Sequence, residues 1–461
     1  MSHETRDDTA AEADPDGQRG PHAYLGELQD VDRIAHSLFP VGAIVRLPLV
    51  FLPDTVLFPG DELPLRMLSP VSVDAIRAHL SGDNGALAVL CESQQGRFAY
   101  GTTVRIEKFS VVGRVASVTG VAKQRFRMKN ARCTGALLGE VEILAHPSAP
   151  RLPFALSHLR APVAAPSSHT TLRRLKARQF TGYWGRNAYA LFDVQRLVSR
   201  IQRTFASSAQ WSWFCKASSS AAPVQQPPLP RPRGSMLRFL TEPSEQLDPS
   251  VFAYWVAGNL PLERAERLAL LRMDCVVRLL RREVEILGQC GDNIYCSGCG
   301  AFLAHTSDIF SRTSHGAAGT FVNPGGSVFQ ILTLREVHPD HVVVDGARSA
   351  EDSWFPGYAW SITYCNSCYR HLGWQFDAVA ADASLSPARF FGFRRAALTQ
   401  SAASRRASAS DLAVYGHEDD DDDFEEVLGD FSDDDDDSIG FPREFSDDDV
   451  DVSPQSGVGE R

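Results

Sequence analysis

Apolar residues in the first third of the chain alternate with polar ones in short runs, a pattern typical of β-strands. The stretch over residues 41–68 is interrupted by four prolines, which favours short strands and turns over a helix. Four further runs of similar pattern follow at residues 85–91, 101–112, 114–128 and 135–144. Because glycines stand at the turns between runs, the sequence predicts a mostly antiparallel β-domain over residues 41–164.

The apolar pattern changes to a helical period over residues 165–290. Its clearest segment places six apolar residues at spacings of three and four, on one face of a single predicted helix: Leu270, Met273, Val277, Leu280, Val284 and Leu287. Pro261 suits the first turn of this helix and Gly288 suits its end. Since a seam of this length is normally buried within its own domain, a packed bundle helix is favoured over a free coiled coil.

Residues 291–400 return to short strands and turns, whereas the two ends of the chain hold few bulky apolar groups. Residues 1–40 and 401–461 are therefore predicted to be disordered. A Pro/Ser-rich insertion over residues 217–235 is predicted to be an extended loop, and its PxxP pattern could fit an SH3-type groove. These patterns together predict an α+β multidomain protein with two β-rich domains and a helical region between them.

Charge is divided unevenly along the chain, whose formal net charge is −11. Residues 418–451 hold 19 acidic residues and one base, Arg443, which leaves about +7 on the remainder. This segment is predicted to be either a solvated tail or an autoinhibitory one that folds back on the basic part. Apolar runs stay below 18 residues and the N-terminus lacks the order of a signal peptide, so neither a transmembrane helix nor a secretory leader is expected.

The nine cysteines are too few and too clustered for a disulfide scaffold, which indicates a reducing compartment. Four of them form two C-x-x-C pairs, Cys296/Cys299 and Cys365/Cys368, separated by 65 residues. Two such turns can close a tetrahedron of thiolates around one structural Zn²⁺ ion, with no position left for water. A redox C-x-x-C motif or unrelated buried cysteines are the alternatives, although a thioredoxin-like motif would occur once, in a βαβ unit.

Three of the seven tryptophans, Trp354, Trp360 and Trp374, fall within 21 residues and flank the second cysteine pair. Phe376 and Tyr358 lie close by in the sequence. Such a cluster predicts either a small aromatic core beside the metal or an aromatic box that binds a compact ring or a cation through its ring faces. The residues alone leave both interpretations open.

The segments LPLVFLPDTVLFPGDELPLRM, GTTVRIEKF and SVTGVAKQRFRM resemble the N-terminal substrate-binding domain of Lon proteases, over about residues 44–159. The resemblance implies a β-rich binding module without catalytic residues. A complete Lon protease would also need an ATPase domain. No lysine of this chain follows a glycine, which excludes the Walker A loop and with it the protease interpretation.

The segments CSGCG, TFVNPGGSVFQILTL, SWFPGYAWSITYCNSCYRHLGWQF and SPARFFGFRRAAL resemble the thalidomide-binding (CULT) domain of the cereblon family, a zinc-stapled β-tent. The resemblance implies a cage for glutarimide-type cyclic imides, with the following ligand-binding residues: Asn323, Pro324, Asp352, Ser353, Trp354, Trp360, Trp374 and Phe376. The order of a Lon-like domain, a helical region and a CULT domain over residues 44–398 is also that of the cereblon family.

Two departures from the family pattern fall at this cage. Asp352 stands where cereblons commonly carry histidine, which removes any side-chain hydrogen bond from that histidine. Gly325, Ser327 and Phe329 replace histidine, tyrosine and histidine in the loop that approaches the ligand. These changes are expected to alter the surface beside the pocket and the proteins that a bound ligand could recruit.

The resemblance implies a non-catalytic substrate receptor of a cullin-RING ubiquitin ligase, in the cytoplasm and nucleus, that directs clients to proteasomal degradation. Its helical region would bind the β-propeller adaptor of a cullin-4-type ligase, and its cage would read C-terminal cyclic imides. Neither nucleic acid nor membrane is an expected partner. The alternatives are a methionine sulfoxide reductase-like enzyme, disfavoured because residues 291–400 hold no cysteine beyond the zinc quartet, and a methyl-lysine reader that uses Asp352.

Overall fold

The computed structural model describes a large part of the compact unit Met1–Ser404. The described residues are 22–31, 38–80, 85–91, 99–134, 136–148, 192–211, 213, 239–240, 242–312, 316–379 and 385–400. The predicted Pro/Ser-rich loop at 217–235 and the acidic segment at 418–451 lie outside them. None of the helices in the described part combines the length and the apolar character that crossing a membrane requires.

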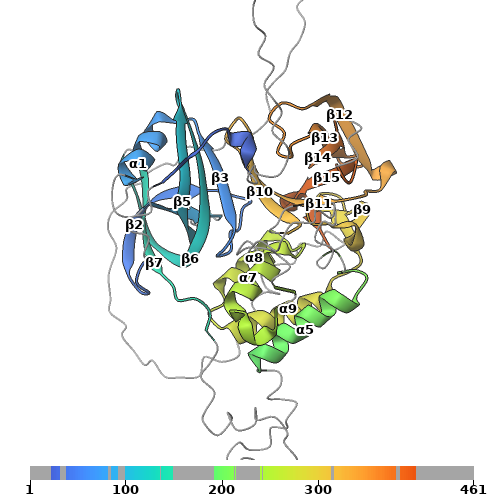
Figure 1. The fold of residues 1–461 in the computed structure, drawn as a ribbon, viewed down its shortest axis with the longest axis horizontal. Coiled ribbons are helices and arrows are strands. Elements are labelled where there is room, and N and C mark those ends of the chain that lie inside the picture. Colours follow the sequence, from blue (N-terminus) through green and yellow to red (C-terminus); the bar gives the residue numbers. More distant parts are fainter. Residues whose placement is uncertain are drawn as a thin grey trace, which may run out of the picture. The chain divides into compact units, whose positions relative to one another are not determined.

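A seven-stranded sheet, blue to teal in Figure 1, forms the first domain. Its strands are β1 (Gln29–Asp30), β2 (Ile44–Phe51), β3 (Glu62–Met67), β4 (Ala86–Leu90), β5 (Tyr100–Val112), β6 (Val115–Thr134) and β7 (Ala136–Ile143), and α1 (Pro70–Leu80) follows β3. The strand order is β1-β5-β4-β2-β7-β6-β3, and a further pairing of β5 with β6 closes five of the strands into a ring. All pairs except β2–β4 are antiparallel, as the alternating runs predict.

Residues 22–31, which the structure describes, depart from the disorder predicted over 1–40. Ala23–Leu25 forms the 3₁₀ helix η1, and β1 pairs with Lys108 and Phe109 of β5. The phenol oxygen of Tyr24 accepts a hydrogen bond from the Val322 N–H (3.2 Å), and its ring packs against Phe321. These contacts with residues distant in sequence hold the segment, and its average composition does not reveal them.

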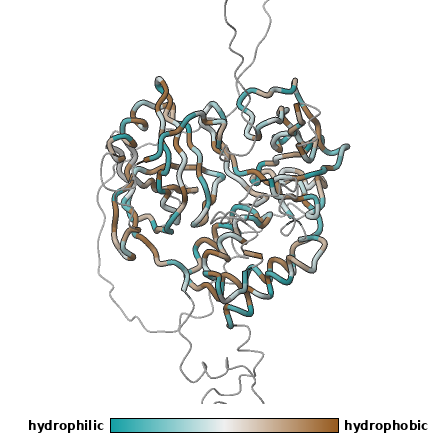
Figure 2. Tube along the Cα trace, in the orientation of Figure 1, coloured by the Kyte–Doolittle hydropathy of each residue, from teal (hydrophilic) through white to brown (hydrophobic). Residues whose placement is uncertain are grey.

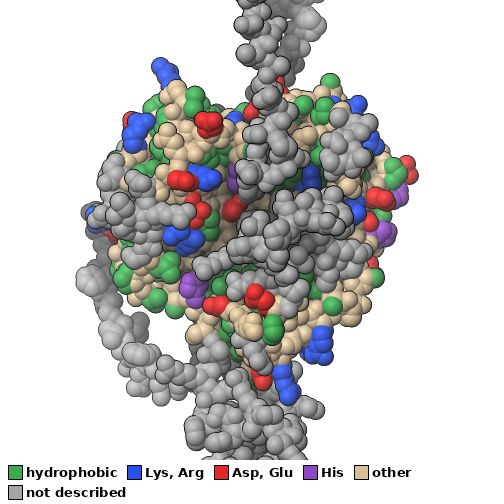
Figure 3. Space-filling view, in the orientation of Figure 1, with side chains coloured by type: hydrophobic (Ala, Val, Ile, Leu, Met, Phe, Trp, Pro, Cys, Tyr) green, Lys and Arg blue, Asp and Glu red, His purple; other side chains and the backbone are tan. Residues whose placement is uncertain are grey.

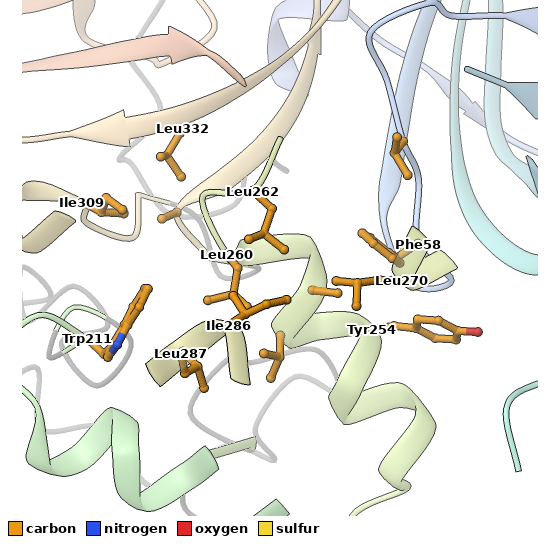
Figure 4. Packing of buried hydrophobic residues seen from close by; sticks show 14 of the residues in the cluster. Phe58, Trp211, Tyr254, Leu260, Leu262, Leu270, Ile286, Leu287, Ile309 and Leu332 are labelled. Atoms are coloured by element: carbon orange, nitrogen blue, oxygen red, sulfur yellow. The ribbon is translucent and has the colours of Figure 1, made fainter. Parts of the chain in front are cut away.

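The helical region contains α5 (Val194–Ser207), α7 (Pro249–Asn259), α8 (Arg264–Arg272) and α9 (Val276–Gln289), preceded by the short η4 (Ser244–Gln246). Aspartate side chains cap two of these helices: Asp193 accepts from the Gln195 N–H, and Asp248 accepts from the Ser250 and Val251 N–H groups. Hydrophobic residues recur along the helices in the tube of Figure 2. Their buried side chains pack with Phe58 of the β-domain and with Ile309 and Leu332 of the second β-rich domain (Figure 4).

The single helix predicted from Leu270 to Leu287 is wrong, because the chain breaks between α8 and α9. Leu270 lies on α8, Met273 lies in the break, and the four later apolar residues lie on α9. The buried Arg125 of β6 donates hydrogen bonds of 2.9 Å to the carbonyl oxygens of Leu271 and Met273, which ends α8 there.

The predicted ends of this helix also shift. Pro261 precedes α8 by three residues instead of lying in a first turn, and α9 runs one residue past Gly288. Hydrogen bonds between residues distant in sequence thus end the helix, although the helical spacing of apolar residues continues.

The second β-rich domain contains a six-stranded and a three-stranded sheet, both antiparallel. The six-stranded sheet has the order β10 (Ala318–Val322), β11 (Val328–Leu334), β15 (Arg389–Arg394), β14 (His371–Ala378), β13 (Tyr358–Cys365) and β12 (Val342–Ser349). The three-stranded sheet has the order β16 (Leu398–Thr399), β8 (Asn293–Cys296) and β9 (Phe302–His305). Short 3₁₀ helices are η5 (Thr306–Asp308), η6 (Pro339–His341) and η7 (Arg395–Ala397). The predicted α+β multidomain class is confirmed.

Two further buried arginines tie the helices to the sheets. Arg395 of η7 donates to the carbonyl oxygens of Gly258 (2.6 Å) and Leu260 at the end of α7. Arg267 of α8 donates to the Val56 carbonyl (2.5 Å) and to the Gln330 side chain on β11. Because a buried guanidinium is costly unless it is hydrogen-bonded, the contacts of the terminal nitrogens of Arg267 and Arg395 hold the two β-rich domains at fixed points along the helices.

Candidate zinc centre and aromatic cage

The four predicted cysteine ligands converge. Their sulfur atoms all lie within 4.8 Å of one another, with 3.6 Å between Cys296 and Cys368 and 3.5 Å between Cys299 and Cys365. A tetrahedral ion with Zn–S bonds of about 2.3 Å needs sulfur–sulfur distances of about 3.8 Å. The four thiols therefore fit one structural zinc ion without rearrangement of the backbone.

The two C-x-x-C turns share one backbone design. Gly300 N–H donates to the Cys296 carbonyl and Tyr369 N–H donates to the Cys365 carbonyl, both at 2.8 Å. The residue after each second cysteine adopts the left-handed conformation, with φ of 74° at Gly300 and 55° at Tyr369. Since Cys296 ends β8 and Cys365 ends β13, the zinc ion would join the three-stranded sheet to the six-stranded one.

Strand register places three of the predicted cage residues on one face of the β13–β14 pair. Trp360 pairs with Phe376, and Ile362 pairs with Trp374 two residues along. Side chains two residues apart on a strand share a face, so Trp360, Trp374 and Phe376 project to the same side. The zinc-bound turn between the two strands sets this register.

Trp354, on the loop before β13, completes the aromatic group. Its ring lies 4.6 Å from that of Trp374 at an angle of 69°, and 6.4 Å from that of Phe376. Hydrogen bonds fix two of the indoles: Trp354 Nε1 donates to the Val322 carbonyl (3.1 Å) and Trp360 Nε1 to the Glu351 carbonyl (2.8 Å). At this separation the Trp354 and Trp374 rings are in edge-to-face contact and form a corner of the aromatic group.

A layer of buried aromatic rings supports the aromatic group from beneath. Phe376 stacks on Phe390 at 5.0 Å and meets Phe355 edge-on at 4.8 Å, and Phe321 stacks on Trp354 at 5.1 Å. The interpretation as an aromatic core therefore holds for part of the tryptophan cluster, and the ligand-binding box stays a prediction. Phe376 and Trp354 belong to a packed core, whereas Trp360 and Trp374 are only half-buried at its surface.

Asp352 stands at the edge of the aromatic group in a left-handed conformation (φ 52°). Its carboxylate lies 3.8 Å from the Arg66 guanidinium of β3, which also donates to the Tyr24 carbonyl (3.3 Å). Ser353 Oγ donates to the Phe355 carbonyl (3.1 Å) and so fixes the turn that carries Trp354. The sequence did not point to Arg66, because its partner lies almost three hundred residues away.

Asn323 and Pro324 lie in the hairpin between β10 and β11. The Asn323 side chain accepts a hydrogen bond from the Ser327 N–H (2.8 Å) and closes this turn. Gly326 follows at φ 81°, and a Cβ atom there would come within 2.8 Å of the Arg66 carbonyl oxygen. The turn therefore packs on β3, next to the arginine that faces Asp352.

A second group of side chains lies against Trp374. Phe329 meets its ring at 5.0 Å and His371 at 4.9 Å, while the Arg394 guanidinium stands 5.5 Å over the Phe329 ring. Arg394 Nη1 donates to His371 Nδ1, and His371 Nε2 donates to the Gly373 carbonyl, both at 3.2 Å. Burial, with the Arg394 charge, lowers the pKa of His371, so the ring is neutral at Trp374.

Comparisons with known proteins agree with this architecture. Residues 46–289 match the family described as the ATP-dependent protease La (LON) substrate-binding domain, and residues 293–411 match the family described as Yippee zinc-binding/DNA-binding/Mis18, centromere assembly. Two solved structures align with low TM-scores. The N-terminal domain of Mycobacterium avium complex Lon protease gives 0.32 at 14% identity, over 53% of this chain and 99% of that one. The Lon N-terminal domain protein from Xanthomonas campestris gives 0.27 at 21% identity, over 52% and 98%.

The chain belongs to the LON substrate-binding domain family, and it carries a zinc-binding β-rich domain behind that module. Over most of its length it is similar to protein cereblon. The cereblon of Danio rerio is 29% identical over 82% of this chain and 85% of its own length, and that of Xenopus tropicalis is 28% identical over 86% of both. The resemblance to the cereblon family and the predicted structural zinc are thereby confirmed.

Proposed function

We propose that the protein is the substrate-recognition subunit of a cullin-RING ubiquitin ligase and that its tryptophan cage reads C-terminal cyclic imides and glutarimide-type ligands. The observation that carries the proposal is the aromatic group on the zinc-tied β13–β14 pair, with Trp354 and Trp374 set at 69° and 4.6 Å apart. A flat imide ring has apolar faces for such walls and a polar edge that needs hydrogen bonds. The backbone at Asp352, Ser353 and Trp354, held in a fixed turn, is the proposed partner of that edge.

A methyl-lysine reader is disfavoured by the surroundings of Asp352. An aromatic box for a trimethylammonium group gains affinity from a carboxylate that has no other counter-charge. Here the Asp352 carboxylate already faces Arg66 at 3.8 Å, and a second cation would be repelled by that arginine. The neutral imide has no such penalty.

A methionine sulfoxide reductase-like enzyme would need a nucleophilic thiol. The cysteines between residues 291 and 400 are the four that converge on the zinc site. A thiolate bound to zinc in a four-sulfur site stabilises the fold and is not free to attack a sulfoxide. The proposed receptor is accordingly non-catalytic.

The helical region is the proposed binding surface for the β-propeller adaptor of a cullin-4-type ligase. On α5 the outward positions are the exposed Arg196, Arg200 and Arg203, and they occur at helical spacing on one face. The face drawn in Figure 3 intersperses acidic and basic side chains, which favours a protein partner over nucleic acid. The cytoplasm and nucleus are the proposed compartments of the complex.

A thermal-shift titration with glutarimide tests the cage. We expect glutarimide to raise the Tm of the wild type, and Trp360→Ala, which removes one wall, to abolish the shift. Tyr369→Phe is the matched control, because this exposed ring lies on the same β13–β14 turn outside the aromatic group. The proposal fails if the wild type shows no shift, or if Trp360→Ala responds as the wild type does.

A further inference from the structure

A cavity of about 300 Å³ lies beside the aromatic group, between the loop that follows β2 and the β10–β11 hairpin. Its apolar walls are Phe51, Leu52 and Pro53 from the first β-domain and Val328 and Phe329 from the zinc-binding domain. Polar side chains line the rest of it: Asp54, Thr55, Ser327, Gln330 and Arg394. Phe51, the last residue of β2, is 44% exposed. Its ring therefore offers apolar surface to anything that enters the cavity.

Phe329 belongs both to this cavity and to the surroundings of the tryptophans. Its ring lies 5.0 Å from that of Trp374 and 6.0 Å from that of Trp354. Neighbouring Cα atoms along a polypeptide are only about 3.8 Å apart. A residue joined to an imide that is held by the tryptophans therefore comes within reach of Phe329, which also lines the cavity.

The charged side chains at the cavity already have partners. Arg394 lies over the Phe329 ring, donates to His371 Nδ1 and stands 3.9 Å from the Asp54 carboxylate. The arginine and the aspartate offset each other, so the cavity presents no unopposed charge to a ligand. A charged side chain would lose its hydration there without gaining an ion pair, whereas an apolar one would be buried against two phenylalanines.

We propose that the cavity between Phe51 and Phe329 binds the side chain of the residue immediately before a C-terminal cyclic imide, and that it selects a large apolar or aromatic residue. The inference rests on the proposed imide-reading function and adds a preference for the sequence of the client. We expect such a side chain to bind about tenfold more tightly than glycine at the same position, a difference of about 1.4 kcal/mol.

The experiment uses peptides that share one sequence and one C-terminal cyclic imide, and that differ only in the preceding residue: Phe, Leu, Gly or Asp. Their affinities are measured for the wild type, for Phe51→Ala and for Val112→Ala. Val112 is the matched control, because it is the 77%-exposed last residue of β5 and does not line the cavity. We expect the wild type and Val112→Ala to prefer Phe and Leu about tenfold over Gly and Asp, and Phe51→Ala to reduce that ratio to within twofold.

Equal affinities of the Phe and Gly peptides for the wild type would overturn the inference, as would a tenfold preference that survives in Phe51→Ala. Binding of free glutarimide to the same preparations separates these results from a failure of the cage. If glutarimide binds, such results overturn the subsite alone. If glutarimide does not bind to the folded wild type, both the proposed function and the subsite fail.

Discussion

Tyr369 follows the second cysteine pair in a left-handed conformation that glycine adopts with far less strain. At the equivalent point of the first pair stands Gly300, with the same hydrogen bond to the first cysteine of its turn. A non-glycine residue in this conformation strains the folded backbone by roughly 1–2 kcal/mol. Glycine avoids this strain but loses about 0.5–1 kcal/mol more backbone entropy on folding than other residues do. The ring of Tyr369 is 73% exposed and recovers little of this strain by packing.

Replacing this residue should therefore stabilise the protein. We expect Tyr369→Gly to raise the free energy of unfolding of the zinc-loaded protein by about 0.5–1 kcal/mol, as measured by chemical denaturation. Gly300→Ala, the reciprocal change in the other turn, should lower it by about 0.5–1 kcal/mol. A loss of stability in Tyr369→Gly would show instead that the exposed ring makes a stabilising contact.

The protonation state of His371 affects the surroundings of Trp374, because the two rings are in contact. Burial and the Arg394 charge lower its pKa below the ordinary 6.5 or so, and its neutral Nδ1 accepts the Arg394 hydrogen bond. Below about pH 6.5 the unfolded chain takes up this proton more readily than the folded one. The contribution of His371 to stability is thus present above that pH and is lost as the pH falls.

The wild type should accordingly lose Tm between pH 6.5 and pH 5 more steeply than His371→Gln, whose amide cannot titrate. Imide affinity should fall in parallel, because a protonated His371 would repel Arg394 and release it from the Phe329 ring beside Trp374. If Tm and imide affinity fall with pH equally steeply in the wild type and in His371→Gln, this role of His371 is contradicted.

The sequence predicted those helices, strands and turns that depend on residues close together in the chain. The alternating runs located β4, β5 and β7 to within one residue at each end, but the run over residues 114–128 ended six residues before β6 does. The C-x-x-C spacing identified a zinc site that needs only two tight turns. The pattern could not predict the break between α8 and α9, because the arginine responsible lies on β6, some 146 residues earlier. The Arg66–Asp352 pair and the ordering of Ala23–Leu25 were missed for the same reason.

Arg125 should therefore be worth more to stability than an ordinary surface arginine. Its side chain is 1% exposed and satisfies carbonyl oxygens of Leu271, Met273 and Ala145. We expect Arg125→Met to cost about 3 kcal/mol or more in urea unfolding, since buried carbonyls left without a donor cost about 1–3 kcal/mol each. Arg127→Met, two residues along β6 in a more exposed ion pair with Glu142, should cost much less. Equal losses in the two variants would contradict the capping role.

At the scale of the molecule, the buried core is divided unequally among the three regions. One large cluster runs from the helices into the zinc-binding domain, with Leu260, Ile286 and Leu332 among its members (Figure 4). It also includes the zinc ligand Cys365 and reaches the first β-domain at Val56, Phe58 and Cys91. The first β-domain has two clusters of its own, with Leu87 and Phe126 among their members. Loss of zinc should therefore propagate from the zinc-binding domain into the helices and leave the two separate clusters of the first β-domain packed.

Removing one thiolate tests this division. A structural zinc ion contributes on the order of 10 kcal/mol to the folding of zinc-dependent modules. Cys299→Ser should expose residues 293–379 and α7 to α9 to limited proteolysis while the strands β2 to β7 stay protected. Cys275→Ser, at a thiol outside the quartet, should digest as the wild type does. Full protection of residues 293–379 in Cys299→Ser would show that the zinc site is dispensable for the fold.

The proposed ligand of the tryptophan cage is a neutral cyclic imide. Calorimetric titration of a cyclic-imide peptide and of a trimethyl-lysine peptide into the wild type and Asp352→Asn tests this proposal most directly. We predict that the imide peptide alone binds, with an affinity within a few-fold in both proteins, because Asp352 already faces Arg66 and the ligand carries no charge. Binding of the trimethyl-lysine peptide, weakened tenfold or more by Asp352→Asn, with no binding of the imide, would contradict the account.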